Sequence, residues 1–537
     1  MGKFAFLNKD ILFERKDDRK LWLKYCGFLD LYIEEFMTIQ KTLLNDEIDL
    51  IQKSELGKKI IGGRKIENLD DFRKNVRFTT YSDYQPYFDK KNESVLPEKP
   101  VLWARTSGHS GIVKWIPYTR ENIRVLADNT LSAFILSSAN NSGEVKLRPG
   151  ARVVLNLPPV PYTTGVMGYA AEERLLYYPI PSPEKAERME FQERIEQGFY
   201  TALRSGIDYA ASLAVVLNQI GRSFSKLGND SAVSLKTLHP LAAVRLVQAS
   251  ITARMANRRI IPKDIWKIKG LVCGGTDTAI YQDEIAQNWG IKPLDVYVAT
   301  ETCFIAMQSW NKKGMTLVPY SNFYEFIPEE EFQKSKRDSN YKPTTVLTDE
   351  LEVDRIYEIV ITNFHGGSLV RYRIGDLIKV TSIGDEETNS TLPQIVFQSR
   401  VDDVVDLDGY VRLNEKEIWR AIHNTYLPYE DWTVRKEHNE QEPVLHIYLE
   451  LTNGSHDSQT IASLIADQLK NMGRDYHNFN EMIDLIPIEV TLLNQGTFHE
   501  YTKRKQSEGF EITRLKPHHI NPSDTELNDL LTISASL

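Results

Sequence analysis

The most conspicuous scarcity in this chain is cysteine, with three among 537 residues: Cys26, Cys273 and Cys303. An odd number of widely separated cysteines excludes a disulfide scaffold and a cysteine-rich zinc site, and it is typical of a reducing compartment. Long apolar runs are also missing, because the longest, around residues 209–217, falls well short of the roughly 20 residues that span a bilayer. The first residues lack the apolar core of a signal peptide. We therefore expect a cytoplasmic protein with no membrane partner.

A basic excess is missing as well, since the formal net charge is −9. Nucleic acid is therefore not expected as a partner, because no broad positive surface is available to neutralise phosphates. The chain is 41% hydrophobic and 26% charged, which is typical of a folded globular protein. Its length predicts either two or more domains or one large domain. The composition gives no information on the oligomeric state.

The apolar pattern divides the chain into three parts. Residues 1–95 have the three- and four-residue spacing of helices, as in Leu29, Tyr32 and Phe36. From Val101, short apolar runs alternate with turns and long helical patterns, which predicts a layered α/β domain. Residues 184–257 are expected to be mostly helical. After about residue 400, strand and helix patterns predict a small α+β domain. The expected domains are thus 1–399, with its helical lead-in, and 400–537, joined by a linker over residues 402–409.

The first segment whose residues could bind a ligand follows a strand-like run at residues 101–103. Its glycines permit positive φ angles and a close backbone approach, its hydroxyl and N–H groups can donate to phosphate oxygens, and a lysine adds positive charge. The Gly-Lys-Ser/Thr ending of the usual P-loop is absent. An ordinary Ser/Gly surface turn is the alternative interpretation. The candidate residues are Thr106, Ser107, Gly108, His109, Ser110, Gly111 and Lys114.

A second segment places Gly274, Gly275 and Thr276 directly after a strand, about twenty residues before a Tyr-Val-Ala-Thr-Glu run at residues 297–301. Paired glycines admit a flat ring, Tyr297 offers a stacking face, and Glu301 offers an oxygen ligand for Mg²⁺. The alternative is a strand end whose tyrosine packs in the core and whose glutamate is solvated.

Two further segments are candidates: one lies before the expected domain boundary near residue 400, and the other lies at that boundary. Asp376 follows a glycine in Arg-Tyr-Arg-Ile-Gly-Asp, where its carboxylate can accept from both hydroxyls of a ribose; the alternative is a turn with two surface arginines. The run that starts at Arg400 contains Asp402 and Asp403, and its alternative is a polar linker. A basic tail follows later, with Lys503, Lys505 and the paired His518 and His519. Adjacent histidines rarely chelate one ion, so a solvated charged face is the preferred interpretation.

In order and spacing, these segments resemble the adenylate-forming superfamily of acyl-CoA synthetases, luciferases and peptide-synthetase adenylation domains. Residues 106–114, 297–301, 372–376 and 399–403 stand where that superfamily has its phosphate loop and its Tyr-Gly-x-Thr-Glu, Tyr-Arg-Thr-Gly-Asp and Gly-Arg-x-Asp-Asp motifs. The resemblance covers residues 100–520 or so. Departures occur at His109, Val298 and Asp406.

Two subfamilies are most similar. Residues 161–172 and the stretch up to Ile418 look like phenylacetate-CoA ligases. The N-terminal helices over 40–84, residues 322–328, residues 357–376 and the later Gly496-Thr497-Phe498 look like plant auxin-responsive acyl acid amido synthetases. We favour the second group, which joins a carboxylic acid to an amino acid through an acyl-adenylate.

The resemblance implies an ATP-dependent ligase that uses Mg²⁺, a small carboxylic acid, and an amino acid or other amine. It places the β- and γ-phosphates in the loop from Thr106 to Lys114, and the adenine against Gly274, Gly275, Thr276 and Tyr297. It assigns the α-phosphate to Thr300, Mg²⁺ to Glu301, the ribose to Asp376 and Arg400, the hinge to Asp402, and the catalytic lysine to Lys516, with Lys503 and Lys505 as rivals.

Two other functions remain open. In an acyl-CoA ligase, CoA would be the acceptor. A non-catalytic nucleotide-binding relative would explain His109 and the altered hinge by loss of activity. The acid pocket is expected among residues 155–220 and 270–305, with residues 158–162 and Met167 as lining candidates.

Overall fold

The computed structural model describes residues 4–106, 113–189, 191–214, 216–218, 220–221, 239–274, 278–338, 340–400, 404–407, 411–439, 442–453, 457–472, 487–507 and 517–537. Backbone contacts divide the chain into two units. Met1–Thr106 and Lys114–Val401 belong to the larger unit, and Asp402–Leu537 belongs to the smaller one. Both mix helices with sheets, which confirms the predicted α/β class.

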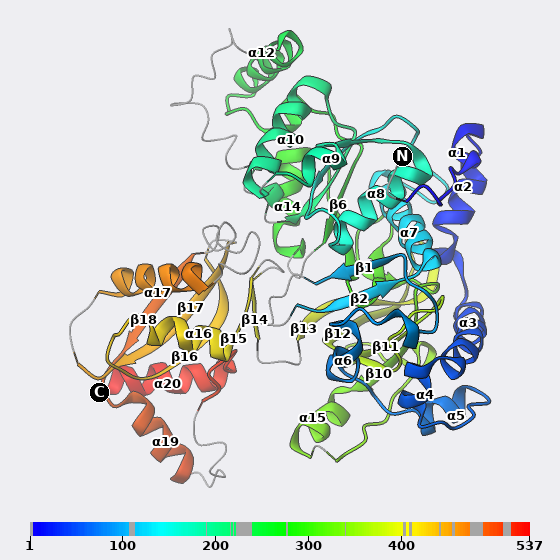
Figure 1. Ribbon diagram of the computed structural model, residues 1–537. Helices are drawn as coiled ribbons and strands as arrows, with labels where there is room; N and C mark the ends of the chain where they lie inside the picture. The colour runs from blue at the N-terminus through cyan, green and yellow to red at the C-terminus, as the bar shows by residue number, and fades with distance from the viewer. Residues whose placement is uncertain are drawn as a thin grey trace. The chain divides into compact units, whose positions relative to one another are not determined.

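The larger unit begins with the expected helical segment, drawn in blue along one side of that unit in Figure 1. Its longest helix, α3 (Ile33–Lys53), buries one face that includes Phe36, Leu44, Ile48 and Ile51. Leu29 and Phe36 are buried as predicted, but Tyr32 was wrongly placed on this face, because it caps the helix and is 63% exposed. The other helices are α1 (Ile11–Arg15), α2 (Asp18–Tyr25), η1 (Gly27–Asp30), α4 (Glu55–Ile61), α5 (Leu69–Asn75), α6 (Tyr81–Phe88) and η2 (Glu93–Val95).

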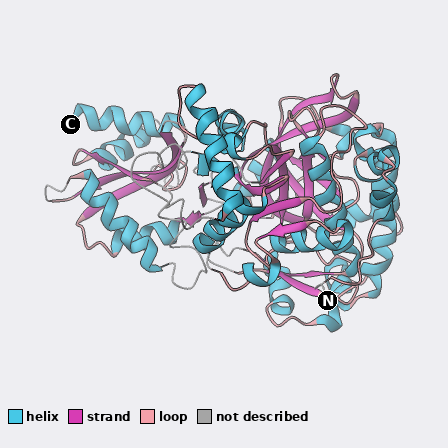
Figure 2. Cartoon of the chain, turned by 90° about the horizontal axis from the view of Figure 1, so that it is seen from above, coloured by secondary structure: helices cyan, strands magenta, loops and turns pink. Residues whose placement is uncertain are grey.

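An eleven-stranded sheet forms the centre of this unit, and Figure 2 shows helices surrounding its strands. The strand order is β10-β11-β12-β13-β9-β8-β7-β6-β5-β3-β4, and the strands from β4 to β7 pair in parallel. The strands are β3 (Arg152–Asn156), β4 (Tyr178–Ile180), β5 (Tyr209–Leu213), β6 (Gly270–Gly274), β7 (Leu294–Ala299), β8 (Cys303–Gln308), β9 (Met315–Leu317), β10 (Asn322–Pro328), β11 (Ile356–Asn363), β12 (Tyr372–Asp385) and β13 (Ser390–Arg400).

A separate hairpin of β1 (Leu102–Arg105) and β2 (Trp115–Tyr118) flanks the segment proposed for phosphate binding. Helix α7 (Arg120–Ser138) follows it and is capped by Thr119, whose hydroxyl accepts from the backbone N–H of Asn122. The remaining helices of this unit are α8 (Thr163–Leu175), α9 (Pro183–Ala186), α10 (Phe191–Ser205), α12 (Pro240–Met255), α13 (Pro262–Ile265), α14 (Thr278–Trp289), α15 (Glu329–Arg337) and η3 (Thr348–Glu350).

The smaller unit contains two short sheets and four helices within its described residues. Strand β17 is central in the three-stranded sheet, pairing antiparallel with β16 and parallel with β18. The elements are β14 (Val404–Leu407), β15 (Val411–Asn414), α16 (Glu415–His423), β16 (Tyr429–Asn439), β17 (Glu442–Leu451), α17 (Ser458–Met472), β18 (Ile488–Leu493), α19 (Thr497–Ser507) and α20 (Asp524–Ser536).

Two predictions of secondary structure were also wrong. Tyr209–Leu213 is the strand β5 rather than part of a helical stretch, because a short strand buried on both faces has the same continuous apolar pattern as a buried helix. The predicted linker over 402–409 contains the strand β14, whose Val405 and Leu407 are buried opposite β15. The acidic residues hid this short alternating pattern.

All three cysteines are buried and free. Burial raises the pKa of the Cys303 thiol to about 12 and also raises the pKa of Cys26 and Cys273. These thiols therefore stay protonated and unreactive near neutral pH. Among the described residues, none of the helices combines the length and apolar character that crossing a bilayer requires.

Candidate nucleotide and acid site

The two ends of the expected phosphate loop are held together at the mouth of the β1–β2 hairpin. The backbone N–H of Thr106 donates to the carbonyl oxygen of Lys114 at 3.0 Å, and the Lys114 N–H donates back to Oγ1 of Thr106 at 3.0 Å. Ser107, Gly108, His109, Ser110 and Gly111 lie outside the described residues. The hairpin thus fixes the direction in which the Lys114 side chain leaves the backbone.

Lys114 reaches the predicted magnesium ligand. Its Nζ lies 3.0 Å from Oε1 of Glu301 and 3.3 Å from the hydroxyl of Tyr372, and both charged side chains are largely buried. Residues almost two hundred positions apart are therefore brought together by the hairpin, the β7–β8 turn and β12. The alternative of a solvated glutamate is wrong, since Glu301 is only 9% exposed.

A second pair joins the proposed adenine and ribose positions. The Tyr297 hydroxyl donates to Oδ2 of Asp376 at 2.6 Å, and both residues are buried. The Tyr297 ring also packs edge-on against Phe397, with centroids 5.8 Å apart. Asp376 lies opposite Arg400 in the β12–β13 register, although the Arg400 side chain is outside the described atoms. The structure thus places Tyr297, Asp376 and the backbone of Arg400 on strands of one sheet, and brings the Tyr297 and Asp376 side chains into contact.

The turn between β7 and β8 carries Thr300 and Glu301. Oγ1 of Thr300 accepts from the Thr163 hydroxyl at 3.1 Å, and the Thr300 carbonyl accepts from the Tyr118 hydroxyl at 2.7 Å. Burial raises the pKa of Tyr118 far above its usual value, so this hydroxyl remains a donor. Sequence reasoning did not identify Tyr118, because a tyrosine at the end of a strand has no motif of its own.

Gly274 ends β6, and Gly275 and Thr276 lie outside the described residues. A Cβ added at Gly274 would lie 3.7 Å from the carbonyl oxygen of Val296, an ordinary contact. Glycine is therefore not required here by its immediate protein neighbours. The proposed role in admitting a flat ring stays a prediction.

The two arginines near Asp376 have structural partners. Arg371 is buried and makes a bidentate pair with Glu325, with Nε–Oε2 and Nη2–Oε1 distances of 2.9 and 2.8 Å. Arg373 donates through Nε to Glu358 at 2.8 Å. The alternative of two surface arginines is therefore wrong, because both anchor the start of β12.

The candidate lysines of the smaller unit differ in what the structure describes. Lys505 lies 2.9 Å from Asp529 and is mostly buried, whereas Lys503 is exposed and 3.5 Å from Glu500. Lys516 and Asp402 lie outside the described residues. His518 pairs with Glu526, and His519 pairs with Glu415 and Asp431. Carboxylates therefore engage all four described basic side chains named here.

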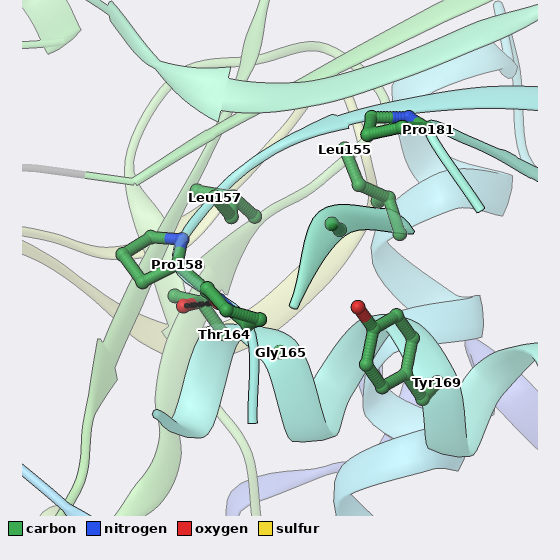
Figure 3. A pocket seen from close by; sticks show the side chains of 9 residues that line it. Leu155, Leu157, Pro158, Thr164, Gly165, Tyr169 and Pro181 are labelled. Atoms are coloured by element: carbon green, nitrogen blue, oxygen red, sulfur yellow. Dashed lines mark hydrogen bonds between the residues drawn. The ribbon is translucent and has the colours of Figure 1, made fainter. Parts of the chain in front are cut away.

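An apolar hollow lies between the end of β3 and helix α8 (Figure 3). Figure 3 shows Leu155 and Leu157 on the β3 side and Thr164, Gly165 and Tyr169 on α8, with Thr164 donating to the Pro158 carbonyl at 3.2 Å. Its volume is about 10 Å³, roughly the space for one water molecule. The lining residues are Leu155, Leu157, Pro158, Pro159, Thr164, Gly165, Tyr169, Pro181 and Ala186. Of the residues expected to line the acid pocket, Pro158 and Pro159 line this hollow, whereas residues 160–162 and Met167 do not.

The fold and the order of the motifs resemble those of adenylate-forming enzymes. Its fold is similar to that of the structure described as AtGH3.15 acyl acid amido synthetase in complex with 2,4-DB, with a TM-score of 0.51, 18% identity and 96% of each chain covered. It is also similar to 2-hydroxyisobutyryl-CoA ligase in complex with 2-HIB-AMP and CoA, with a TM-score of 0.54, 14% identity and coverage of 89% of this chain and 94% of that one.

Sequence models of one family match the chain in consecutive order. The GH3 family N-terminal domain matches residues 27–220, the central domain 315–400 and the C-terminal domain 411–524. The chain therefore belongs to the GH3 family.

Two curated plant relatives match part of the chain. Jasmonoyl--L-amino acid synthetase GH3.5 of Oryza sativa subsp. japonica is 28% identical over 228 residues, which is 40% of this chain and 38% of the rice enzyme. Indole-3-acetic acid-amido synthetase GH3.15 of Arabidopsis thaliana is 24% identical over 218 residues, covering 37% of this chain and 35% of that enzyme. The matched part thus spans less than two fifths of either relative.

Proposed function

We propose that this protein is an ATP-dependent ligase that adenylates a carboxylic acid and transfers the acyl group to an amino acid or another amine. The observation that carries the proposal is the convergence of Lys114 with Glu301, and of Tyr297 with Asp376, in one unit of a GH3-family chain. The names of two GH3 relatives support it, because they describe a jasmonoyl--L-amino acid synthetase and an indole-3-acetic acid-amido synthetase.

In the first step, a carboxylate oxygen attacks the α-phosphorus of ATP. The bond from that phosphorus to the β-bridging oxygen breaks, pyrophosphate leaves, and acyl-AMP forms. Negative charge builds on the phosphate oxygens, so positioned cations and donors supply most of the catalysis. Lys114 and Lys516 provide positive charge in this proposal, and Thr300 donates to the α-phosphate.

The nucleotide is oriented by the second pair. Tyr297 and the glycines of residues 274–275 border the adenine, and Asp376 accepts from the ribose hydroxyls with help from Arg400. Because Tyr297 already donates to Oδ2 of Asp376, the carboxylate is fixed in one orientation before ATP binds. Fixing it in advance reduces the ordering cost of binding.

The residues present suit Mg²⁺. Magnesium in nucleotide enzymes is held by one or two carboxylates together with substrate phosphates, and Glu301 offers a largely buried carboxylate beside the phosphate-loop lysine. When bound, the ion would neutralise phosphate charge. Lys114 meanwhile balances the Glu301 charge and holds the carboxylate in place.

In the second step, a neutral amine attacks the acyl carbon, the bond from that carbon to the phosphate oxygen breaks, and AMP leaves. The nitrogen loses a proton as the amide forms. We place the acid's apolar part beside Thr164 and Tyr169, because the lining there is mainly apolar with few polar groups; the small hollow would have to widen to admit it. We also place the enzyme in the cytoplasm, which suits its three free thiols.

The test is acid-dependent exchange of labelled pyrophosphate into ATP, with Mg²⁺ and a panel of aromatic, aliphatic and short-chain acids. Acids that support exchange are then incubated with pooled amino acids or with CoA, and the products are identified by mass spectrometry. An amide supports the proposal. A thioester as the sole product makes the protein an acyl-CoA ligase. If none of the acids supports pyrophosphate exchange, the result contradicts adenylation.

A further inference from the structure

The turn that carries Thr300 and Glu301 is held through its backbone in an unusual way. Three consecutive carbonyl groups, of Thr300, Glu301 and Thr302, each accept a hydrogen bond from a side chain of a different strand. Tyr118 of β2 donates to the first at 2.7 Å, Asn363 of β11 to the second at 2.9 Å, and Asn322 of β10 to the third at 2.8 Å.

The two asparagines form one connected network. Nδ2 of Asn363 donates to Oδ1 of Asn322 at 2.9 Å as well as to Glu301, and Oδ1 of Asn363 accepts from the backbone of Leu369 at 3.2 Å. Asn322 donates a second time to Phe304 at 3.3 Å. Helix α3 closes the network through Gln40, whose Nε2 donates to the Asn322 carbonyl at 2.8 Å. Each of these amides is mostly or fully buried.

A buried amide left without hydrogen-bond partners destabilises the fold, so the network is stable only when its amides are paired. Its two asparagines point their N–H groups at the turn rather than at a regular sheet ladder. The residue that follows the turn, Cys303, has a φ of 59°, in the left-handed region that non-glycine residues rarely occupy. External donors therefore stabilise a backbone shape that the turn would not favour alone.

We propose that Asn363 is a positioning residue for Glu301: its amide fixes the Glu301 backbone so that the carboxylate faces the metal–ATP site. This inference rests on the proposed function, since it matters only if Glu301 binds Mg²⁺. The Glu301 side chain emerges from the same residue whose carbonyl Asn363 holds. A rotation of that peptide would turn the carboxylate away from Lys114, which now lies 3.0 Å from it.

The experiment measures Mn²⁺ binding directly, by the electron paramagnetic resonance signal of free Mn²⁺ titrated with the full-length protein and ATP. Asn363→Asp keeps the size of the side chain but removes both N–H donors. We expect the Mn²⁺ dissociation constant in the presence of ATP to rise about 10- to 100-fold, the range typical of residues that orient metal ligands. The Mg²⁺ concentration giving half-maximal pyrophosphate exchange should rise in parallel.

Gln394→Glu is the matched control. Gln394 of β13 is also buried, and its Nε2 makes two donations, to Thr316 at 2.9 Å and to the Leu392 carbonyl at 3.0 Å. Within the described part of the chain, its side chain bonds to Thr316 and Leu392 and not to residues 300–302, and its substitution makes the same amide-to-acid change. We expect a lower melting temperature in both variants and altered Mn²⁺ binding in Asn363→Asp alone.

Tyr118→Phe is a second variant. It keeps the ring and removes the hydroxyl that donates to the Thr300 carbonyl and also bonds to Oγ1 of Thr163 at 2.9 Å. We expect its Mn²⁺ dissociation constant to rise roughly 2- to 10-fold, as suits a single neutral hydrogen bond. If Asn363→Asp does not fold, this variant decides the matter.

A folded Asn363→Asp protein with the Mn²⁺ dissociation constant of the wild type overturns the positioning role. If Asn363→Asp does not fold, an unchanged Mn²⁺ dissociation constant in Tyr118→Phe overturns it. An equal shift in Gln394→Glu also overturns it, because the effect would then be general loosening. If the wild-type protein does not bind Mn²⁺ in the presence of ATP, and none of the acids supports pyrophosphate exchange, the proposed function fails and this inference fails with it.

Discussion

At the scale of single residues, the chemistry depends on side chains that the sequence separates widely and the fold brings together. Lys114 and Glu301 are 187 positions apart, and Tyr297 and Asp376 are 79 apart. Their motifs were recognisable, because each combines a residue type with a strand end. Their partners were less so: Tyr118, Asn322 and Asn363 act through backbone groups, and no local pattern marks such a role.

Asp376→Asn should weaken ATP binding. The amide keeps the size of the carboxylate but loses the charge that accepts from hydroxyl groups, and hydrogen bonds to charged groups contribute about 1.5–3 kcal/mol. We expect the KM for ATP in pyrophosphate exchange to rise roughly 10- to 100-fold. Asp385→Asn, at the far end of the same strand, is the control and should leave the KM unchanged. A wild-type KM in Asp376→Asn would exclude the ribose role.

Glu47 should make stability fall as the pH rises from about 4.5 to about 8. This buried residue of α3 accepts from the Gly366 N–H at 2.9 Å, while its Oε1 has no partner in the part of the chain that the structure describes. Burial, with smaller contributions from nearby Glu98 and Asp46, raises its pKa from 4.5 to about 8 despite the opposing effect of the Gly366 hydrogen bond. The folded protein therefore keeps a proton that the unfolded chain has lost. Between pH 4.5 and 8, the free energy of unfolding should fall by up to about 1.4 kcal/mol per pH unit.

Glu47→Gln should remove that dependence, because glutamine has no proton to lose. Urea unfolding measured at about pH 5.5, 7 and 8.5 should show the free energy of unfolding of the variant rising relative to that of the wild type as the pH increases. Glu55→Gln, an exposed member of an ion pair with Lys59, is the control. Parallel curves for wild type and Glu47→Gln would mean that Glu47 is ionised in the folded protein.

At the scale of elements, periodicity predicted the helices well and the short strands less well. The long amphipathic helix α3 was recognisable because one face is apolar over many turns. Strand β5 was not, since a five-residue run of Tyr-Ala-Ala-Ser-Leu fits either period, and only its place between β3 and β6 makes it a strand. Strand β14 was hidden for the opposite reason, because its polar residues alternate with only two buried side chains.

Gly165→Ala should disturb the join between helix α8 and the loop before it. A Cβ at this position would lie 2.3 Å from the Pro159 carbonyl carbon and the Val160 nitrogen, so backbone would have to move. We expect a loss of about 1–3 kcal/mol in the free energy of unfolding, as for other overpacked sites, together with a changed acid preference. Gly27→Ala is the control, because its Cβ would meet nothing within 4 Å. Equal stability of the two variants would contradict the close approach.

Asp402→Pro should separate the two half-reactions. Proline fixes φ and would hold the proposed hinge in one state, whereas related enzymes are expected to rotate the small domain between steps. We expect pyrophosphate exchange to be largely retained and amide formation to be lost, measured on the same preparation. An equal loss of both activities would argue against a hinge at Asp402.

At the scale of the whole molecule, the composition defined only a folded protein without membrane spans or a basic surface. The order of motifs added the fold class, because chemistry-bearing segments at strand ends recur at characteristic spacings in adenylate-forming enzymes. The net charge of −9 was a poor guide to a polyanionic ligand, since a few positioned cations suffice to meet a triphosphate. The identity of the acid depends on pocket shape, which sequence spacing does not encode.

The most direct test of the account follows the oxygen atoms of the acid. An acid that supports exchange is labelled with ¹⁸O in its carboxylate and converted to product with ATP and the accepted amine. Acyl-AMP chemistry transfers one labelled oxygen to the phosphate of AMP, and mass spectrometry should find that label in AMP and none in pyrophosphate. Label in inorganic phosphate, or unlabelled AMP beside a finished amide, would contradict an acyl-adenylate.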